Sequence, residues 1–296
     1  MSAPSNKASI SRSSQQQNVI AYLVLSIGSL AFLIPFYFAL NGSLQTGVDV
    51  LAGRVSPPKS WHEVIWQNYP RSLDKEHLDF KPAFANTVVI TSLCVIGQII
   101  SCSLVGFGFA RFKFRGRSIL FMVMLSTMML PGQVTMIPLF VLFRSLHMVD
   151  TFLPLIIPAW LASPFFVFMF RQFFSQIPEE LIEAARMDGA SNWRIYWQIM
   201  LPLSGPVIAI VAIYTFLGTW NDFLGPLIYL NGREHRTLAI ALNAFKGSQY
   251  GGASEPQLLL AASVVCMLPC LILFFAAQRY FVESVAMTGG KSEAAA

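Results

Sequence analysis

The chain is dominated by apolar stretches that are too long for the core of a water-soluble domain. Apolar residues make up 55% of the 296 residues and charged residues only 12%, with a mean hydropathy of +0.58. A helix of about 20 apolar residues crosses a bilayer and satisfies its own backbone there. Stretches of this kind occur at about 19–40, 84–109, 118–142, 154–174, 202–224 and 258–278. The sequence therefore predicts an all-α, polytopic membrane protein with six transmembrane helices.

Lysine and arginine in the short loops predict the side of the membrane on which each loop lies. The densest basic cluster lies between the second and third spans and consists of Arg111, Lys113, Arg115 and Arg117. Short loops rich in these residues stay in the cytoplasm, so six spans place both termini there. The net charge of +5 is accounted for by this topology and by contact with anionic membrane lipid. Nothing in the charge pattern indicates nucleic acid binding.

The pattern divides the chain into three segments. Residues 1–18 are rich in Ser and Gln and predict a disordered cytoplasmic tail. Residues 19–282 form the transmembrane domain, in which 42–83 is the largest external loop. Residues 283–296 form a cytoplasmic C-terminal tail.

The external loop contains one predicted helix. Ser60 to Glu63 has a capping-box pattern, which predicts a short helix through Tyr69. The aromatic side chains of Trp61, Trp66 and Tyr69 fit two roles, anchorage at the depth of the lipid headgroups or docking of an external partner.

Two spans contain prolines that should break them. Pro131-Gly132 and Pro138 lie in the third span, and Pro158 and Pro164 lie in the fourth. Proline removes a backbone donor, and such breaks are tolerated at membrane depth where protein or a water-filled cavity satisfies the freed groups. The second span instead carries small residues at helical spacing, which predict a face for close helix packing. These residues are Gly97, Ser101, Cys102, Gly106 and Ala110.

A polar segment at 175–201 separates the fourth and fifth spans. Pro178 suits the first turn of a helix, and Glu179 favours the positive end of the helix dipole. Gly189 can take the left-handed conformation that ends a helix. A short helix is therefore expected between Pro178 and Gly189, with Glu179 and Glu183 one turn apart on its exposed side.

A second short helix is expected directly after this turn. Ser191 can cap it, and Pro202 should start the fifth span. Four large apolar residues recur at helical spacing and predict one apolar stripe, namely Trp193, Tyr196, Trp197 and Met200. The resulting helix–turn–helix fits an amphipathic elbow resting on the membrane as well as a docking element for another protein.

This segment resembles the EAA loop of permease subunits in ABC importers. The residues that match the pattern are Glu183, Ala184, Ala185, Asp188, Gly189, Ala190, Ile199, Leu201 and Pro202. Short motifs at 111–116, 171–174, 220–223 and 278–281 look like the carbohydrate branch of this superfamily. Within that branch the chain is most similar to the six-span subunit of maltose- and oligosaccharide-type permeases.

The resemblance implies a type I ABC importer in a bacterial or archaeal inner membrane. A second permease subunit would complete a heterodimer, two cytoplasmic ATPase subunits would bind ATP and Mg²⁺, and an extracytoplasmic solute-binding protein would deliver a sugar or oligosaccharide. This chain would then bind no cofactor, carry no catalytic residue, and move its substrate by alternating access. The segment 175–201 would form the cytoplasmic coupling helix. The residues assigned to ATPase coupling are Glu179, Glu183, Ala184, Ala185, Asp188, Gly189 and Ala190.

Asn221 and Asp222 lie near the external end of the fifth span. A carboxylate at that depth is costly unless it faces water or a partner. Asp222 therefore either faces the translocation path or braces the break at Gly225-Pro226 by accepting from freed backbone donors. The external loop 225–257 that follows is expected to be flexible, either as a contact for a binding protein or as a connector.

The main alternative function is a secondary transporter driven by an ion gradient. Broken spans and an intramembrane acid would also suit it, although ionisable residues at mid-membrane are few. No serine–histidine pair or metal-ligand set that could support an enzyme gathers in a span. The cysteines are interpreted as small core residues, with no metal site, and are Cys94, Cys102, Cys266 and Cys270.

Overall fold

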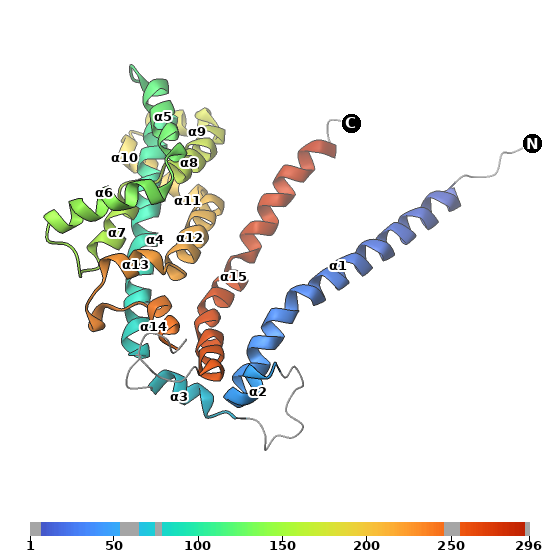
Figure 1. The fold of residues 1–296 in the computed structure, drawn as a ribbon. Coiled ribbons are helices and arrows are strands. Elements are labelled where there is room, and N and C mark those ends of the chain that lie inside the picture. Colours follow the sequence, from blue (N-terminus) through green and yellow to red (C-terminus); the bar gives the residue numbers. More distant parts are fainter. Residues whose placement is uncertain (1–6, 54–64, 75–78, 246–254, 294–296) are drawn as a thin grey trace, which may run out of the picture. The chain divides into compact units, whose positions relative to one another are not determined.

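The computed structural model describes residues 7–53, 65–74, 79–245 and 255–293, which form helices and no strand (Figure 1). The longest helices are α1 (Lys7–Ser43), α4 (Phe80–Arg111), α12 (Gly205–Trp220) and α15 (Pro256–Glu293). Those of intermediate length are α5 (Arg117–Ser126), α6 (Gly132–Ser145), α7 (Leu153–Trp160), α8 (Pro164–Gln176) and α9 (Glu179–Met187). The short ones are α2 (Gly47–Leu51), α3 (Asn68–Asp74), α10 (Asn192–Ile195), α11 (Leu201–Leu203), α13 (Leu224–Tyr229) and α14 (Leu238–Ala244), with short turns η2 (Thr127–Met129), η3 (Tyr196–Met200) and η4 (Arg233–His235).

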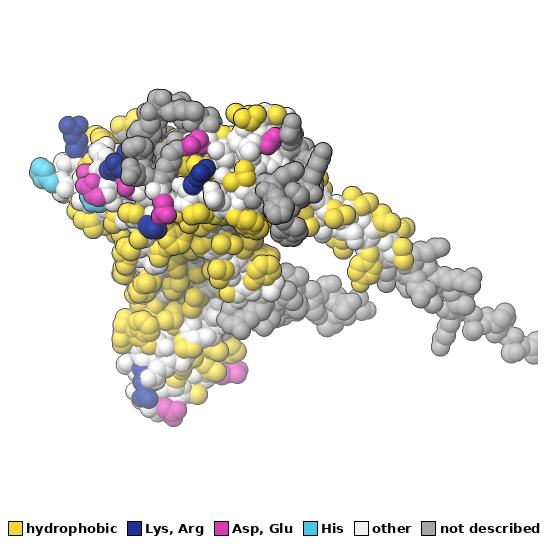
Figure 2. Space-filling model, turned by 90° about the horizontal axis from the view of Figure 1, so that it is seen from below, with side chains coloured by type: hydrophobic (Ala, Val, Ile, Leu, Met, Phe, Trp, Pro, Cys, Tyr) yellow, Lys and Arg dark blue, Asp and Glu magenta, His cyan; other side chains and the backbone are white. Residues whose placement is uncertain are grey.

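The described helices include four that are long and apolar enough to cross a membrane, or up to six if each of two bent pairs is one span. The four are Val19–Ser43, Phe80–Arg111, Leu153–Gln176 and Pro256–Gln278, close to predicted positions. Large apolar side chains on α5 and α6 are exposed, as lipid contact requires. Figure 2 shows one face of the molecule, on which hydrophobic side chains predominate and charged side chains gather in separate groups.

Tertiary contacts divide the chain into two compact units. The first contains residues 1–72 and 245–265. Within it, Asn68 fixes the end of α1, because its side-chain amide donates to the carbonyls of Ser43 and Gln45 at 2.9 Å each. The Tyr69 hydroxyl lies 2.8 Å from the Ser43 hydroxyl, so Tyr69 packs inside this unit, whereas Trp66 is exposed.

Two predictions in the first unit need correction. Helix α1 begins at Lys7, so residues 7–18, which we expected to be disordered, continue the helix. Once a long helix exists, each added residue gains a backbone hydrogen bond without a new nucleation cost. The helix expected to start at Ser60 begins at Asn68 in the described residues, after a turn at 65–67, and it extends to Asp74. Residues 60–64, including Trp61, lie outside the described residues.

The second unit, residues 73–244 and 266–296, is organised around α4. Helices α7, α8 and α12 pack against α4 (Figure 1). The small residues predicted as a packing face lie on this contact: Gly97 is covered by the Trp160 ring, and Cys102 is fully buried. At Gly106 an added Cβ would lie 2.7 Å from the Phe170 Cβ. The predicted face is confirmed.

The break in the fourth span is satisfied by a side chain from α4. The chain leaves α7 at Trp160 and enters α8 at Pro164, with Ala162 at a φ of 59°. With its amide oriented to suit both partners, buried Gln98 donates to the Ala159 carbonyl and accepts from the Ser163 N–H, each at 3.0 Å. A polar residue inside a packed apolar helix thus replaces the backbone hydrogen bonds that the break removes.

The third predicted span is broken more sharply than a kink. Helix α5 with η2 and helix α6 are bent by 98° relative to each other at Pro131, which directly precedes the first residue of α6. Pro131 adopts an extended conformation, with ψ of 135°, so the helix cannot pass through it.

The fifth predicted span begins later than expected. Pro202 lies in α11, which ends at Leu203, and α12 begins at Gly205 after a bend of 76° at Ser204. Pro206 accounts for the bend, because it has no N–H to donate to the Pro202 carbonyl four residues earlier and its ring clashes with that carbonyl in a continuous helix. Ser204, which is fully buried, donates its hydroxyl to the Met200 carbonyl at 2.6 Å.

The close contact at Gly106 predicts that alanine substitutions at two positions of α4, Gly106 and Gly108, change the free energy of unfolding in opposite directions. Gly106→Ala should lower the free energy of unfolding by about 1–3 kcal/mol, because its Cβ overlaps Phe170 and lies 3.1 Å from the Arg171 nitrogen. Gly108→Ala, with nothing within 4 Å, should raise it by roughly 0.5–1 kcal/mol, because alanine favours the helix. Thermal unfolding of the purified variants in detergent measures both, and equal shifts would contradict the packing.

Candidate functional site

The segment 175–201 forms the expected helix–turn–helix. Helix α9 ends at Met187, and Gly189 has a φ of 76°, in the left-handed region. Its N–H donates to the Arg186 carbonyl at 2.9 Å. Ser191 caps α10 by accepting from the Arg194 N–H at 3.2 Å. The left-handed turn predicted at Gly189 and the cap predicted at Ser191 are confirmed, and Pro178 lies at the N-cap of α9 instead of in its first turn.

A buried cluster holds this segment against α4 and α8. Ile182 and Ile195 are 1% exposed, and both belong to one apolar cluster with Phe107 and Phe174. Tyr196 is fully buried and lies with its ring centroid 5.4 Å from that of Phe107. Its hydroxyl lies 2.7 Å from the Ser103 hydroxyl on α4. The segment is therefore fastened to the body of the second unit by apolar contacts and by one buried hydrogen bond.

Arg111, at the end of α4, also holds the segment through hydrogen bonds and an ion pair. Its guanidinium donates to the carbonyls of Phe174 and Ile177 at 2.5 and 2.7 Å, and it forms an ion pair with Glu179 at 2.6 Å. The Arg111 side chain is only 7% exposed. Arg111 thereby caps the end of α8 and orients the start of α9. The pairing of Arg111 with Glu179 could not be predicted from the sequence, because the two residues are 68 positions apart.

The residues assigned to coupling divide into two groups in the structure. Ala185 and Ala190 are partly buried against the apolar cluster, and Glu179 is paired with Arg111. The remaining four, with their exposed neighbour, form what we call the loop edge: Glu183, Ala184, Met187, Asp188 and Gly189. Met187 is 89% exposed, which is unusual for an apolar side chain and was not singled out from the sequence.

The apolar stripe predicted for the second helix is present, because the ring centroids of Trp193, Tyr196 and Trp197 lie 5.3 to 5.8 Å apart, but only part of it is buried. Tyr196 and Met200 are buried, but Trp193 and Trp197 are 60% and 43% exposed. The chain from Tyr196 to Met200 is a π-helix, in which the Leu201 N–H donates to the Tyr196 carbonyl five residues earlier. The stripe therefore lies across the boundary between the buried and the exposed surface of the segment, with Tyr196 and Met200 on its inner side.

Asp222 follows the end of α12, where the chain is no longer helical. One carboxylate oxygen accepts from the Gly225 N–H at 3.1 Å, so Asp222 braces the break as one of its two proposed roles required. Asn221 is exposed and donates to the Leu217 carbonyl at 2.8 Å, which caps α12. The pathway role of these two residues remains a prediction.

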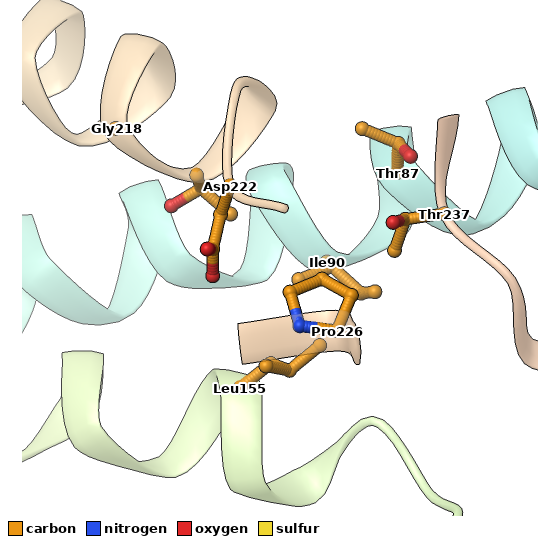
Figure 3. Close-up of a pocket in the computed structure, with 8 residues that line it drawn as sticks. Thr87, Ile90, Leu155, Gly218, Asp222, Pro226 and Thr237 are labelled. Carbon is orange, nitrogen blue, oxygen red and sulfur yellow. The ribbon is translucent and has the colours of Figure 1, made fainter. Parts of the chain in front are cut away.

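A cavity of about 110 Å³ lies beside Asp222. Figure 3 shows the carboxylate directed toward the space next to Pro226 and Leu155, with Thr87 and Thr237 on its other side. Thr87 donates to the Ala83 carbonyl and accepts from the Leu238 N–H, each at 2.9 Å. The remaining lining residues are Ile90, Gly218 and Thr219.

The loop after α13 is not the flexible segment that we expected, at least through Phe245. Asp150 accepts from the N–H groups of Asn231 and Gly232 at 2.9 and 2.7 Å and lies 3.3 Å from His235. Asn86 donates to two carbonyls of the same loop, at 2.8 and 3.0 Å. These contacts come from residues far away in sequence, so composition alone could not reveal them. Residues 246–254 of the predicted loop lie outside the described residues.

Comparison with protein families places most of this unit in one of them. Residues 103–287 match the family described as binding-protein-dependent transport system inner membrane component. The match includes the segment 175–201 and Asp222.

Relatives of known assignment are similar along nearly the whole chain. The arabinooligosaccharides transport system permease protein AraQ of Bacillus subtilis is 34% identical over 89% of this chain and 92% of its own. The melibiose/raffinose/stachyose import permease protein MelC of the same organism is 31% identical over 90% and 94%. A solved chain of a bacterial ABC transporter involved in the import of alginate has a TM-score of 0.77 at 23% identity, covering 95% of this chain and 100% of its own. That likeness shows a shared fold.

The buried contacts of Arg111 predict that its substitution destabilises the protein, whereas substitution of an exposed arginine does not. Arg111→Ala should lower the free energy of unfolding by about 3 kcal/mol, because two carbonyls and Glu179 lose a buried charged donor. Arg115→Ala, at an exposed position of the same basic cluster, should change it by less than about 0.5 kcal/mol. Thermal unfolding and proteolysis between α8 and α10 measure the effect. Equal stability of the two variants would show that Arg111 does not hold the loop.

Asp150 predicts a pH-dependent stability. The Gly232 N–H holds the pKa of Asp150 below its ordinary value; partial desolvation opposes this, and the Asn231 N–H and His235 add to the lowering. A lowered folded-state pKa contributes stability above the ordinary Asp pKa, and this is lost as pH falls through the folded value. Wild type should therefore exceed Asp150→Asn in melting temperature at neutral pH, and the difference should vanish in strong acid. Asp74→Asn, an exposed carboxylate, is the control.

Proposed function

Since the chain belongs to the family of binding-protein-dependent transport system inner membrane components, we propose that it is the permease subunit of an ATP-driven ABC importer for a sugar or oligosaccharide. It is a transport subunit and not an enzyme. The observation that supports this most directly is the segment 175–201, which presents an exposed edge to a partner while its inner side is fastened to α4.

The geometry supports transmission of motion through this segment. Force applied to the loop edge reaches α4 through Tyr196, Ser103 and Arg111, because the intervening contacts are buried and close-packed. A docking element must make different contacts in two states if it is to shift the equilibrium between them. Glu183, Asp188 and Met187 offer charge and apolar surface for such contacts.

The partners follow from the same proposal. The loop edge docks on a cytoplasmic ATPase, of which two copies bind ATP and Mg²⁺, and this chain pairs with a second permease subunit. A solute-binding protein outside the cell delivers the sugar. The relatives AraQ and MelC are named for transport of arabinooligosaccharides and of melibiose, raffinose and stachyose. The chain crosses the membrane six times, with both termini in the cytoplasm, if each bent helix pair counts as one span.

The loop edge provides the first test. Met187→Glu should abolish copurification with the ATPase without lowering the melting temperature, because the side chain is 89% exposed and has no packing to lose. Leu146→Glu, exposed between α6 and α7, should leave copurification intact. Gly189→Pro should abolish copurification as well, since proline cannot adopt a φ of 76°. Retention of the ATPase by both Met187→Glu and Gly189→Pro would refute docking at this segment.

Energy coupling separates the proposal from the secondary transporter. We expect uptake of labelled arabinotriose or raffinose by proteoliposomes with the complete complex to require ATP on the ATPase side and to survive collapse of the proton gradient. Uptake without ATP that stops when the gradient collapses would favour the secondary transporter instead.

A further inference from the structure

The polar groups that line the Asp222 cavity indicate that its ligand carries hydrogen-bond donors. Asp222 is the only charged residue among its lining residues, and the other polar side chains are threonines. An ionised carboxylate only accepts hydrogen bonds. One Asp222 oxygen bonds to the Gly225 N–H, so the carboxylate retains acceptor capacity toward the cavity.

The side chain of Thr237 independently indicates that the cavity binds a ligand. Its hydroxyl is buried and has no hydrogen-bond partner among the described residues, and the residue is only 4% exposed. A buried hydroxyl without a partner is costly and calls for an explanation. Thr87, by contrast, already donates and accepts within the protein. Thr237 is therefore available to a molecule that enters the cavity.

The apolar walls and the volume of the cavity restrict which kind of ligand can bind in it. Ile90, Leu155 and Pro226 form apolar walls, which suit the C–H surface of a sugar ring. A volume of about 110 Å³ admits one edge of a sugar and not a whole oligosaccharide. A bare cation would need about six oxygen ligands, and apolar side chains occupy much of this lining.

We propose that the Asp222 cavity is a subsite for hydroxyl groups on one edge of the transported sugar, with Asp222 accepting from one hydroxyl and Thr237 bonding to its neighbour. This inference rests on the proposed function. The cavity is lined from α4, α7, α12 and α13, so any movement between these helices changes its shape. The subsite would thus bind the sugar in one conformational state and release it in another.

Three substitutions test the subsite in the complete complex in proteoliposomes, with labelled arabinotriose and raffinose as probes. Asp222→Asn keeps an acceptor for the Gly225 N–H but removes the charge, and we expect about a tenfold fall in kcat/KM. Thr237→Val should lower kcat/KM about threefold while the melting temperature stays equal or rises. Thr215→Val is the matched control, because that hydroxyl is also buried without a partner but does not line the cavity; it should leave uptake within about twofold.

Deoxy analogues of the transported probe separate sugar contact from bracing of the helix break. If Asp222 receives a sugar hydroxyl, removal of that hydroxyl should cost wild type about tenfold and Asp222→Asn less than about twofold. The same binding protein serves both, so its own preference cancels. Equal losses for every analogue would overturn the subsite while leaving the proposed function intact.

Two other outcomes would separate the sugar subsite from a cation site and from a failure of the proposed function. A fall in wild-type uptake when choline replaces Na⁺, absent in Asp222→Asn, would assign the cavity to a cation and overturn the sugar subsite. Failure of wild type to take up any probe with ATP would overturn the proposed function, and this inference with it.

Discussion

The close packing of α4 against α7 and α8 is the contact on which the second unit depends. Glycine at 106 brings the helices so near that a methyl group would overlap Phe170, and Trp160 covers Gly97 in the same way. This proximity allows Gln98 to reach the backbone of the broken fourth span. Small residues on α4 therefore permit the break beside it, since a more distant helix could not satisfy the freed N–H and carbonyl groups.

Polar side chains within this apolar protein serve mainly to complete an interrupted backbone. Gln98 does so between α7 and α8, Arg111 at the end of α8, Ser204 at the bend before α12, and Asp222 at the break that follows α12. Each of these groups would be expensive at its depth if it lacked a partner. Thr237 differs from them, because its hydroxyl has no partner within the described chain and the residue lines the cavity, and the proposed sugar subsite depends on this combination.

The features that depend on local chemistry could be predicted from the sequence. Gly189 and Ser191 behave as predicted because turn and cap preferences are properties of one residue and its neighbours. Features that depend on distant residues could not be predicted in this way. Tyr196 is buried and its neighbour Trp197 is exposed, because the spacing of a stripe does not say where the buried surface ends. The pairing of Arg111 with Glu179 needed the fold, and the exposure of Met187 could be known only once its neighbours were placed.

The continuity of α4 links the segment 175–201 to the cavity. The helix has 32 residues and is therefore about 48 Å long. Ser103 and Arg111 bind the segment 175–201 toward one end, and Thr87 lines the cavity toward the other. Breaks occur in its neighbours, at Pro131, Ala162, Ser204 and Asp222, but α4 has none. Under the proposed function, motion imposed on the segment would carry α4 as one body while the neighbouring helices bend at their breaks, and this would alter the cavity without any change in its lining residues.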